Sequence, residues 1–334
     1  MTLDILYIRA GGSGWGPIDQ LADLTARLLD GNLVTLQDRG EVSIARKLLG
    51  QLPRHRSGDR ALLVLASNPA HLAYSARLRH WLPGYRRTAA WVIDSFWSDR
   101  ISRMARRRGH FDHIFITDRE LQEKWASATG SAIRWAPWGT DTLAIKELPS
   151  ERPVDLLRVG RQPAAWDDDR RTAEAAAAAG LTFEGRPAMH PDPAMNQQNV
   201  RSALLRSKFV LAFSNLVSPA DYTHPTRDYV TGRWTDALGA GAIVAGVAPS
   251  AAVRTLGPAS TIEIDPSNLS RGIVQIRAAV ERWSPSIPEQ THARARATLD
   301  WRWRIHEIAL ALDLAPTTQF QNELTLLEAG GTIR

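Results

Sequence analysis

The apolar positions of the chain follow two spacings. Short runs of consecutive apolar residues predict buried strands, and apolar residues that recur every three or four positions predict helices. Residues 61–66 are a run of the first kind, whereas Ile18, Leu21, Leu24 and Leu28 show the helical period. Strands and helices alternate in this way from residue 3 to residue 135. Such alternation predicts a parallel sheet with right-handed crossovers and helices on both faces.

The alternation stops at a linker around 139–155, which contains Gly139, Pro149 and Pro153, and then starts again. The predicted strands are 3–9, 32–37, 61–66, 88–93, 113–117, 132–135, 154–159, 181–184, 209–213, 242–246 and 261–264. The predicted helices are 18–29, 43–52, 69–82, 99–107, 120–129, 170–179, 197–205, one around 235–238, 270–282 and 300–312. The pattern predicts two doubly wound α/β domains, 1–145 and 146–315, facing a central cleft, with a tail at 316–334.

The composition excludes several classes of protein. The 334 residues include no cysteine, which excludes disulfides, thiolate zinc sites, iron–sulfur clusters and cysteine nucleophiles. No apolar run reaches the roughly 18 residues of a membrane span. Asp4 and Arg9 interrupt the first apolar stretch, so no signal peptide is expected. We expect a cytoplasmic protein.

The charge is uneven along the chain. Residues 1–150 contain 21 basic and 15 acidic side chains, whereas residues 151–334 contain 20 of each. The excess in the first half indicates an anionic partner there, such as lipid, a phosphorylated acceptor or nucleic acid. The arginine-rich segment 99–108 predicts a basic helix that rests on an anionic membrane or is simply a solvated face. We favour peripheral binding to the inner membrane face over nucleic acid.

A glycine-rich loop follows the first predicted strand. Gly11, Gly12 and the glycines after them precede a predicted helix, where backbone N–H groups can approach an anion. The loop lacks the Gly-Lys-Ser/Thr of a nucleotide-binding P-loop, and Pro17 stands where a dinucleotide fingerprint needs its third glycine. Asp38 ends the second strand, where a ribose-binding acid would lie, so a nicotinamide-dependent oxidoreductase stays an alternative.

The densest group of polar residues lies in the segment 224–246. We expect Asp236 to open a helix and to accept hydrogen bonds from sugar hydroxyls, while Arg227 and Arg233 fork onto phosphate oxygens. Hydroxyl acceptors beside phosphate clamps are what a nucleotide-sugar site needs. The alternative is that Asp236 caps its helix and the arginines are solvated.

The chain resembles GT-B glycosyltransferases of bacteria, in particular the group similar to the CgeB-like proteins. Asp228-x7-Asp236-Ala with Gly241 is similar to the E-x7-E element of retaining enzymes, and Arg233 to Leu238 (RWTDAL) is similar to the R-x-F-E-A-L variant. Further similar segments are Val159-Gly160-Arg161, Trp91-Val92-Ile93-Asp94 and 136–141 (APWGTD). The chain departs from the pattern because both glutamates are aspartates and because the acceptor-domain histidine has no clear counterpart.

The resemblance implies a fold, a reaction and roles. It implies two Rossmann-like domains with the C-terminal helix packing back toward the first. It also implies a metal-independent transfer of a sugar from a nucleotide diphosphate donor to a saccharide or lipid-linked acceptor, with no cofactor. Asp236 would hold the ribose, and Asp228 would contact the transferred sugar as a catalytic residue. The remaining donor-binding residues would be Gly11, Gly12, Arg161, Gly185, Arg186, Ser214, Asn215, Arg227 and Arg233.

Asp94 is the candidate base for the acceptor hydroxyl, because it ends a predicted strand on the cleft side. The alternative is a carboxylate that caps Ser98 or the next helix. Asp167, Asp168 and Asp169 lie at a helix start, so we interpret them as a solvated first turn rather than a metal site. A glycosyltransferase-like binding protein without catalysis also stays open, since both family glutamates are replaced.

Overall fold

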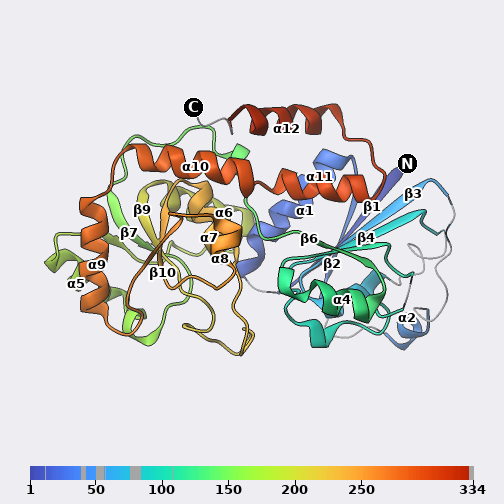
Figure 1. Cartoon of the computed structure of the whole chain (residues 1–334), viewed down its shortest axis with the longest axis horizontal. Coiled ribbons are helices and arrows are strands. Elements are labelled where there is room, and N and C mark those ends of the chain that lie inside the picture. The colour runs from blue at the N-terminus through green and yellow to red at the C-terminus, as the bar shows by residue number, and fades with distance from the viewer. Residues whose placement is uncertain are drawn as a thin grey trace. The chain divides into compact units, whose positions relative to one another are not determined.

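The structure is a computed structural model, and it describes residues 1–11, 13–38, 43–49, 56, 58–75, 84–107 and 109–330. The chain forms two compact units (Figure 1). Unit 1 comprises Met1–Pro137 and Arg302–Leu324, and unit 2 comprises Trp138–Trp301 and Thr325–Arg334.

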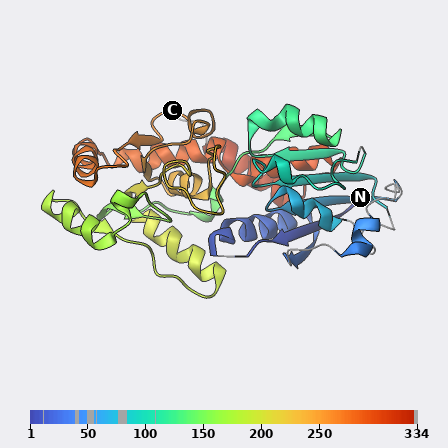
Figure 2. The ribbon, with the colours of Figure 1, turned by 90° about the horizontal axis from the view of Figure 1, so that it is seen from below.

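Unit 1 is built on a six-stranded parallel sheet, seen from two sides in Figures 1 and 2. Its strands are β1 (Thr2–Arg9), β2 (Asn32–Gln37), β3 (Arg60–Ala66), β4 (Arg87–Val92), β5 (His113–Ile116) and β6 (Ala132–Trp135), in the order β2-β1-β3-β4-β5-β6. Residues 61–66 of β3 have no exposed surface, which explains why this strand is apolar on both faces.

The helices of unit 1 are α1 (Gly16–Leu29), α2 (Ile44–Leu49), α4 (Gln122–Thr129), α11 (Trp301–Ala311) and most of α12 (Thr318–Gly330), with 3-10 turns η1 (Ser13–Trp15), η2 (Pro69–Ser75), η3 (Ser98–Arg100) and η4 (Arg119–Leu121). In α1, Ile18, Leu21, Leu24 and Leu28 are buried, as their spacing predicted. Pro17 stands in the first turn of α1, where a proline costs no hydrogen bond.

Unit 2 is built on a five-stranded parallel sheet. Its strands are β7 (Val154–Arg158), β8 (Phe183–Glu184), β9 (Ser207–Leu211), β10 (Ile243–Gly246) and β11 (Thr261–Glu263), in the order β11-β10-β9-β7-β8. Its helices are α5 (Asp169–Ala178), α6 (Pro193–Leu205), α7 (Gly232–Gly239), α8 (Ala252–Leu256), α9 (Leu269–Glu281) and α10 (Ser286–Thr298), with 3-10 turns η5 (Thr142–Ala144) and η6 (Ala164–Trp166). Trp166, Phe209, Phe213 and Ile276 form the centre of one hydrophobic core.

Both sheets have the same strand order. Read by position along each unit, the first strand lies between the second and the third, and the fourth and fifth follow. The chain therefore reverses its winding direction between β1 and β3 and again between β7 and β9. In open parallel sheets, ligands bind beyond the carboxyl ends of the strands at such a reversal. Each unit thus has one topologically favoured edge for a site.

The predicted α/β fold is confirmed, and three local predictions need correction. The basic segment 99–107 is no α-helix: only Ser98–Arg100 forms a 3-10 turn, and turns follow it. The helix expected at 69–82 is the 3-10 helix Pro69–Ser75 over its described part. The helix expected at 43–52 is present as Ile44–Leu49, and residues 50–52 lie outside the described residues. Helix α10 was missed because it contains Pro288 and eight charged or polar residues, which leave no clear apolar period.

The borders of the two compact units differ from the expected domain boundaries at 145 and 315. The first crossing lies after Pro137, and Arg302–Leu324 belongs to unit 1. The expected return of the C-terminal helix to the first domain is thus confirmed for α11 and the first part of α12. The segment expected as a tail, 316–334, contains the helix α12 (Thr318–Gly330). Within the described part of the chain, no helix combines the length and the apolar character that spanning a membrane requires.

Candidate functional site

The favoured edge of unit 2 is formed by the loops after β7 and β9. Gly160 and Arg161 follow β7, and Ser214 and Asn215 follow β9. Gly160 has a φ of +76°, and a Cβ there would lie 2.8 Å from Cδ of Arg233 on α7. Glycine is thus required both by the backbone conformation and by the close approach of Arg233. The reversal point brings a loop and a helix together around two arginines.

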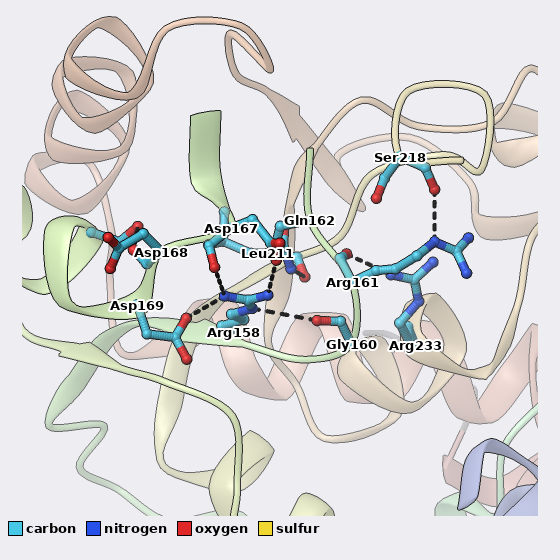
Figure 3. Close-up of polar contacts among 11 residues, drawn as sticks. Arg158, Gly160, Arg161, Gln162, Asp167, Asp168, Asp169, Leu211, Ser218 and Arg233 are labelled. Atoms are coloured by element: carbon cyan, nitrogen blue, oxygen red, sulfur yellow. Dashed lines mark hydrogen bonds and ion pairs between the residues drawn. The ribbon is translucent and has the colours of Figure 1, made fainter. Parts of the chain in front are cut away.

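Two arginines three residues apart in this region have opposite surroundings (Figure 3). Arg158 is buried, and its guanidinium forms ion pairs of 2.5 Å with Asp167 and with Asp169. Arg161 instead donates from Nε to the carbonyl oxygen of Ser218 at 2.6 Å and from Nη1 to the hydroxyl of Tyr222 at 2.8 Å. Among the described residues, no carboxylate pairs with Arg161. Two carboxylates therefore compensate the positive charge of Arg158, whereas no described carboxylate compensates that of Arg161.

Arg233 adds a second charge beside Arg161. Its Nη1 donates to the carbonyl oxygen of Arg161 at 3.3 Å, and none of the carboxylates that the structure describes pairs with it. Desolvation, and then repulsion from Arg161, lowers the pKa of Arg233 to about 10. Two neighbouring guanidiniums without a counter-charge repel each other, so an anion between them would relieve this repulsion. The predicted proximity of Arg161 and Arg233 is present in the structure.

Buried acceptor atoms without donors lie in the same loops. Asn215 is buried, and its Nδ2 donates to the carbonyl oxygens of His224 at 3.0 Å and Arg227 at 2.6 Å, which fixes the orientation of the amide. Its Oδ1 receives no hydrogen bond from the described residues. The same holds for Oε1 of Gln162, whose Nε2 donates to the carbonyl oxygen of Leu211 at 3.4 Å. Leaving a buried acceptor without a hydrogen bond costs about 1–3 kcal/mol of free energy. A ligand that donates a hydrogen bond to either oxygen would remove this cost.

Helix α7 is held in place by contacts at both ends. Thr235 donates its hydroxyl hydrogen bond to the carbonyl oxygen of Gly139 at 2.7 Å. At the other end, Nη2 of the buried Arg152 donates to the carbonyl oxygen of Ala240 at 2.5 Å. Burial lowers the pKa of Arg152 to about 10. A cation that binds the last carbonyl groups of a helix stabilises that end, so the position of Arg233 on α7 is well defined.

The sequence had predicted that Asp236 opens a helix, and the structure shows that this prediction was wrong. Helix α7 begins at Gly232 with Thr231 as its N-cap residue, which places Asp236 in the helix interior and excludes the capping alternative. Nε2 of Gln197 on α6 donates to Oδ2 of Asp236 at 3.3 Å, and the side chain of Thr140 also hydrogen-bonds to this carboxylate. Desolvation raises the pKa of Asp236 to about 6, against the effect of these bonds and of Arg201.

Asp228 is bound to the loop after β10. Its two carboxylate oxygens accept hydrogen bonds from the backbone N–H and the hydroxyl of Ser250, each at 2.8 Å. Its neighbour Arg227 lies half-buried in the segment that Asn215 ties down. Asp228 and Asp236 thus contact different elements of unit 2, and the sugar-binding role of Asp228 stays a prediction.

The remaining donor candidates of unit 2 lie in two places. Ser214 is buried, and its carbonyl oxygen accepts from the N–H of Ser218, which itself binds Arg161. Gly185 lies against Asp169, since a Cβ there would be 2.9 Å from Oδ2 of that aspartate. Arg186 is exposed. The structure therefore groups Ser214 with the two arginines, and it places Gly185 beside the ion pairs of Arg158.

Asp94 lies two residues beyond Val92, the last residue of β4, at the carboxyl edge of unit 1. The half-buried carboxylate has no hydrogen-bond or ion-pair partner among the described residues, and desolvation raises its pKa to about 7. The N–H of Trp97 binds the backbone oxygen of Asp94, and the proposed capping of Ser98 by the side chain is not observed. An unpaired carboxylate with this pKa is suited to accept a proton near neutral pH.

The other candidates of unit 1 are less informative. Gly11 is exposed with open space around it, and Gly12 lies outside the described residues. Asp38 accepts a hydrogen bond from Tyr74 at 3.0 Å and lies 2.9 Å from Nε2 of the buried His71. These contacts occupy the carboxylate that the nicotinamide alternative needs for a ribose.

Acidic residues do not gather into a metal site in the part of the chain that the structure describes. Asp168 caps α5 by accepting from the N–H of Arg171 at 3.0 Å, as the interpretation of a first helical turn implies. Asp167 and Asp169 are not simply solvated carboxylates, because each forms an ion pair with Arg158. The metal independence of the activity stays a prediction.

Sequence reasoning missed three polar residues near these candidates: Gln162, Gln197 and Tyr222. Gln162 directly follows the candidate Arg161, and this adjacency could have identified it as a site residue. Gln197 and Tyr222 reach the site from a helix and a loop that are distant in sequence, and only the fold reveals their contacts.

The sequence matches no family model, and none of the curated proteins matches it. The fold matches that of solved structures. The UDP-forming α,α-trehalose-phosphate synthase of Burkholderia xenovorans has 12% identity and a TM-score of 0.52, with 94% of this chain and 99% of that chain covered. The α,α-trehalose 6-phosphate synthase of Burkholderia multivorans has 12% identity, a TM-score of 0.49 and coverages of 93% and 96%.

A structure of S. aureus MnaA with UDP has 9% identity and a TM-score of 0.44, with coverages of 94% and 98%. Identities this low concern the fold alone, and of these three structures the first has a TM-score above 0.5. The chain therefore has two parallel-sheet α/β domains of the Rossmann-like kind from which the GT-B fold of glycosyltransferases is built.

Proposed function

We propose that this chain is a glycosyltransferase that moves a sugar from a nucleotide diphosphate donor to a saccharide or lipid-linked acceptor. The observation that carries the proposal is the pair Arg161 and Arg233, which has no carboxylate partner among the described residues and lies at the winding reversal of unit 2. The orphaned oxygens of Gln162 and Asn215 add acceptors for hydroxyl or N–H donors. A ligand that combines two phosphates with hydroxyl groups satisfies both needs.

The proposed reaction breaks the bond between the anomeric carbon and the phosphate oxygen, and it forms a bond from that carbon to an acceptor oxygen. The electron pair leaves with the diphosphate, where Arg161 and Arg233 stabilise the developing charge. The acceptor hydroxyl loses its proton to Asp94. Asp236 holds the ribose and Asp228 contacts the transferred sugar. We propose retention of the anomeric configuration and no metal requirement, on the strength of the sequence resemblance.

Ligand binding tests this proposal directly. UDP, GDP and TDP should be compared with NAD and NADP by calorimetry, followed by incubation with labelled sugar donors in the presence and absence of a chelator. Tight binding of a nucleoside diphosphate, and release of the labelled sugar with added chelator, are expected. Binding of NAD or NADP without any nucleoside diphosphate would contradict the proposal.

A binding protein without catalysis is the second candidate, and one observation favours it. Each oxygen of Asp228 accepts a hydrogen bond from Ser250 at 2.8 Å, which ties this carboxylate to the loop after β10 and leaves only its remaining lone pairs for a sugar hydroxyl. Under this alternative, the nucleotide sugar binds but its sugar is neither transferred nor hydrolysed. Product analysis by mass spectrometry after prolonged incubation separates the two candidates.

We also propose that unit 1 contacts an anionic membrane surface, because the excess charge of the chain lies in its first 150 residues. Arg103 and Arg106 are exposed in the turns after η3. Each base near the surface gives about 1 kcal/mol, so changing Arg103, Arg106 and Arg107 to Gln should reduce binding to anionic vesicles by about 100-fold. Activity on a soluble acceptor should stay unchanged. Equal binding of wild type in 0.15 M and roughly 0.5 M salt would contradict an electrostatic contact.

A further inference from the structure

Two acceptor groups lie side by side between α6 and α7, which are neighbours in Figure 1. One is the carboxylate of Asp236, and the other is the amide oxygen of Gln197. The 3.3 Å hydrogen bond from Nε2 of Gln197 to Oδ2 of Asp236 fixes the amide, so its oxygen is held beside the carboxylate. That amide oxygen receives no hydrogen bond from the residues that the structure describes.

The carboxylate retains capacity for a ligand. Each of its oxygens has two lone pairs, whereas Gln197 and Thr140 together supply two donors. Asp236 is half-buried, and Arg201 is close enough to act on it electrostatically. A further hydroxyl donor would therefore be received by a poorly solvated carboxylate, where hydrogen bonds to a charged group are strongest.

The position of this pair relative to the arginines is set by the helix. Arg233 and Asp236 are three residues apart on α7, so their side chains leave the same face with Cβ atoms about 5–6 Å apart. In a nucleoside diphosphate, a single C5′ carbon joins the ribose ring to the first phosphate. A phosphate at Arg233 thus leaves the ribose within reach of the next side chain along that face.

We propose that Gln197 and Asp236 each accept a hydrogen bond from one of the two vicinal ribose hydroxyls, so that the site selects ribonucleoside over deoxyribonucleoside diphosphates. This inference rests on the proposed function, because it takes the diphosphate at Arg161 and Arg233 as given. Removal of one hydroxyl leaves a partly buried acceptor without its donor, and such sites reject the deoxygenated analogue strongly. Gln197 is therefore a specificity-determining residue contributed by α6.

Calorimetry with defined analogues tests the inference. The probes are UDP, 2′-deoxy-UDP and 3′-deoxy-UDP, together with the same three forms of GDP. In wild type, we expect the loss of either hydroxyl to weaken binding by about tenfold. In Gln197→Met, which keeps the length of the side chain but lacks its amide, the penalty for one of the two hydroxyls should disappear and the other should remain. Asp236→Asn should reduce the remaining penalty.

The neighbouring Gln198 provides the matched control, because it is exposed on the same helix. Gln198→Met should retain both penalties, and equal unfolding temperatures of the three proteins should exclude a folding defect. Wild type that binds ribo and deoxy forms equally, or Gln197→Met that retains both penalties, would overturn the diol proposal alone. If wild type binds neither UDP nor GDP, the proposed function falls and this inference falls with it.

Discussion

The two sheets have the same strand order, but different kinds of side chain lack an ionic partner at their carboxyl edges. In unit 1, Arg9 pairs with Asp19 at 2.5 Å, and Asp94 is a half-buried carboxylate without a hydrogen-bond or ion-pair partner among the described residues. In unit 2, Arg158 is neutralised, and the groups that remain unpaired are the cations Arg161 and Arg233. One edge therefore suits the acceptance of a proton and the other the binding of an anion. Topology places the ends of the strands, and the pairing of side chains decides what each edge binds.

The largest expected effect on activity concerns Asp94 at the carboxyl edge of unit 1. Asp94→Asn should lower kcat by about 10²–10⁴-fold, because the amide cannot accept the acceptor's proton. With the pKa of Asp94 raised to about 7, kcat/KM of wild type should rise as the pH passes through 7 and then level off. The asparagine variant should lose this rise. Initial rates measured between pH 5 and pH 9 would show it.

Stability supplies a control that does not depend on activity. Desolvation raises the folded-state pKa of Asp94 above its unfolded value of 3.8, so the folded protein holds a proton that the unfolded chain has released. The stabilising contribution of this proton is full below pH 3.8 and is lost as the pH rises toward 7. Asp94→Asn should thus be more stable than wild type at pH 8. A variant that keeps the wild-type pH–rate profile would show that Asp94 is not the base.

The second-largest expected effect concerns the carboxyl edge of unit 2 with Arg161 and Arg233, which we call the basic edge. Arg233→Ala should weaken the binding of a nucleoside diphosphate by roughly 2 kcal/mol, about 30-fold, because a charge-assisted contact is lost. Calorimetry is the measurement. Arg170→Ala is the matched control, since Arg170 is exposed on α5 and pairs only with Glu174 among the described side chains. Wild-type affinity in Arg233→Ala would mean that the phosphates bind elsewhere.

The sequence revealed much of this comparison because strand ends are local features. Asp94 and Arg161 lie two and three residues beyond the ends of β4 and β7, and parallel sheets bring the carboxyl ends of their strands to one edge. Pairing is not local. Nothing in the sequence indicated that Asp167 and Asp169 neutralise Arg158 while Arg161 remains without a carboxylate. The sequence therefore located the edges, and the structure was needed to determine their charge.

Helix starts were a weaker inference for a related reason. Asp236 has the side chain of a helix N-cap, but Thr231 begins the helix because Gly232 to Thr235 already carry its first turn. The basic helix predicted around residue 103 failed in the same way: Met104 and Ala105 are buried, so tertiary packing overrides the helical propensity of the arginines. Burial of Met104 and Ala105 thus outweighs local propensity in the second case, whereas in the first case α7 simply begins before Asp236.

A further prediction separates the roles of Asp228 and Asp236 in unit 2. Asp236→Asn should chiefly raise KM, because a ribose bond is made equally in the ground state and the transition state. Asp228→Asn should lower kcat, by about tenfold, because contacts with the transferred sugar strengthen as its bond breaks. Steady-state kinetics with the donor varied distinguishes the two. The opposite pattern, or two variants with wild-type constants, would remove the roles that the resemblance implies.

The smallest expected effect concerns how Arg161 is held. Tyr222 is 73% exposed, and it contacts Arg161 through its hydroxyl at 2.8 Å and through its ring, whose centroid lies 5.1 Å from the guanidinium carbon. Tyr222→Phe removes the hydroxyl and keeps the ring. Exposed contacts of this kind contribute about 0.5–1 kcal/mol, so nucleoside diphosphate binding should weaken by about threefold.

Tyr222→Ala removes both contacts and should weaken binding further than Tyr222→Phe does. If Tyr222 positions Arg161 for an anion, binding of inorganic pyrophosphate should fall in the same order, because this probe has neither ribose nor base. Calorimetry with pyrophosphate and with UDP makes the comparison. Tighter binding in Tyr222→Phe would mean that the hydroxyl competes with the anion for Arg161, since the freed Nη1 donor would then be available to phosphate. The basic edge would in that case be partly masked by its own tyrosine, and the contrast with the unpaired carboxylate of unit 1 would narrow.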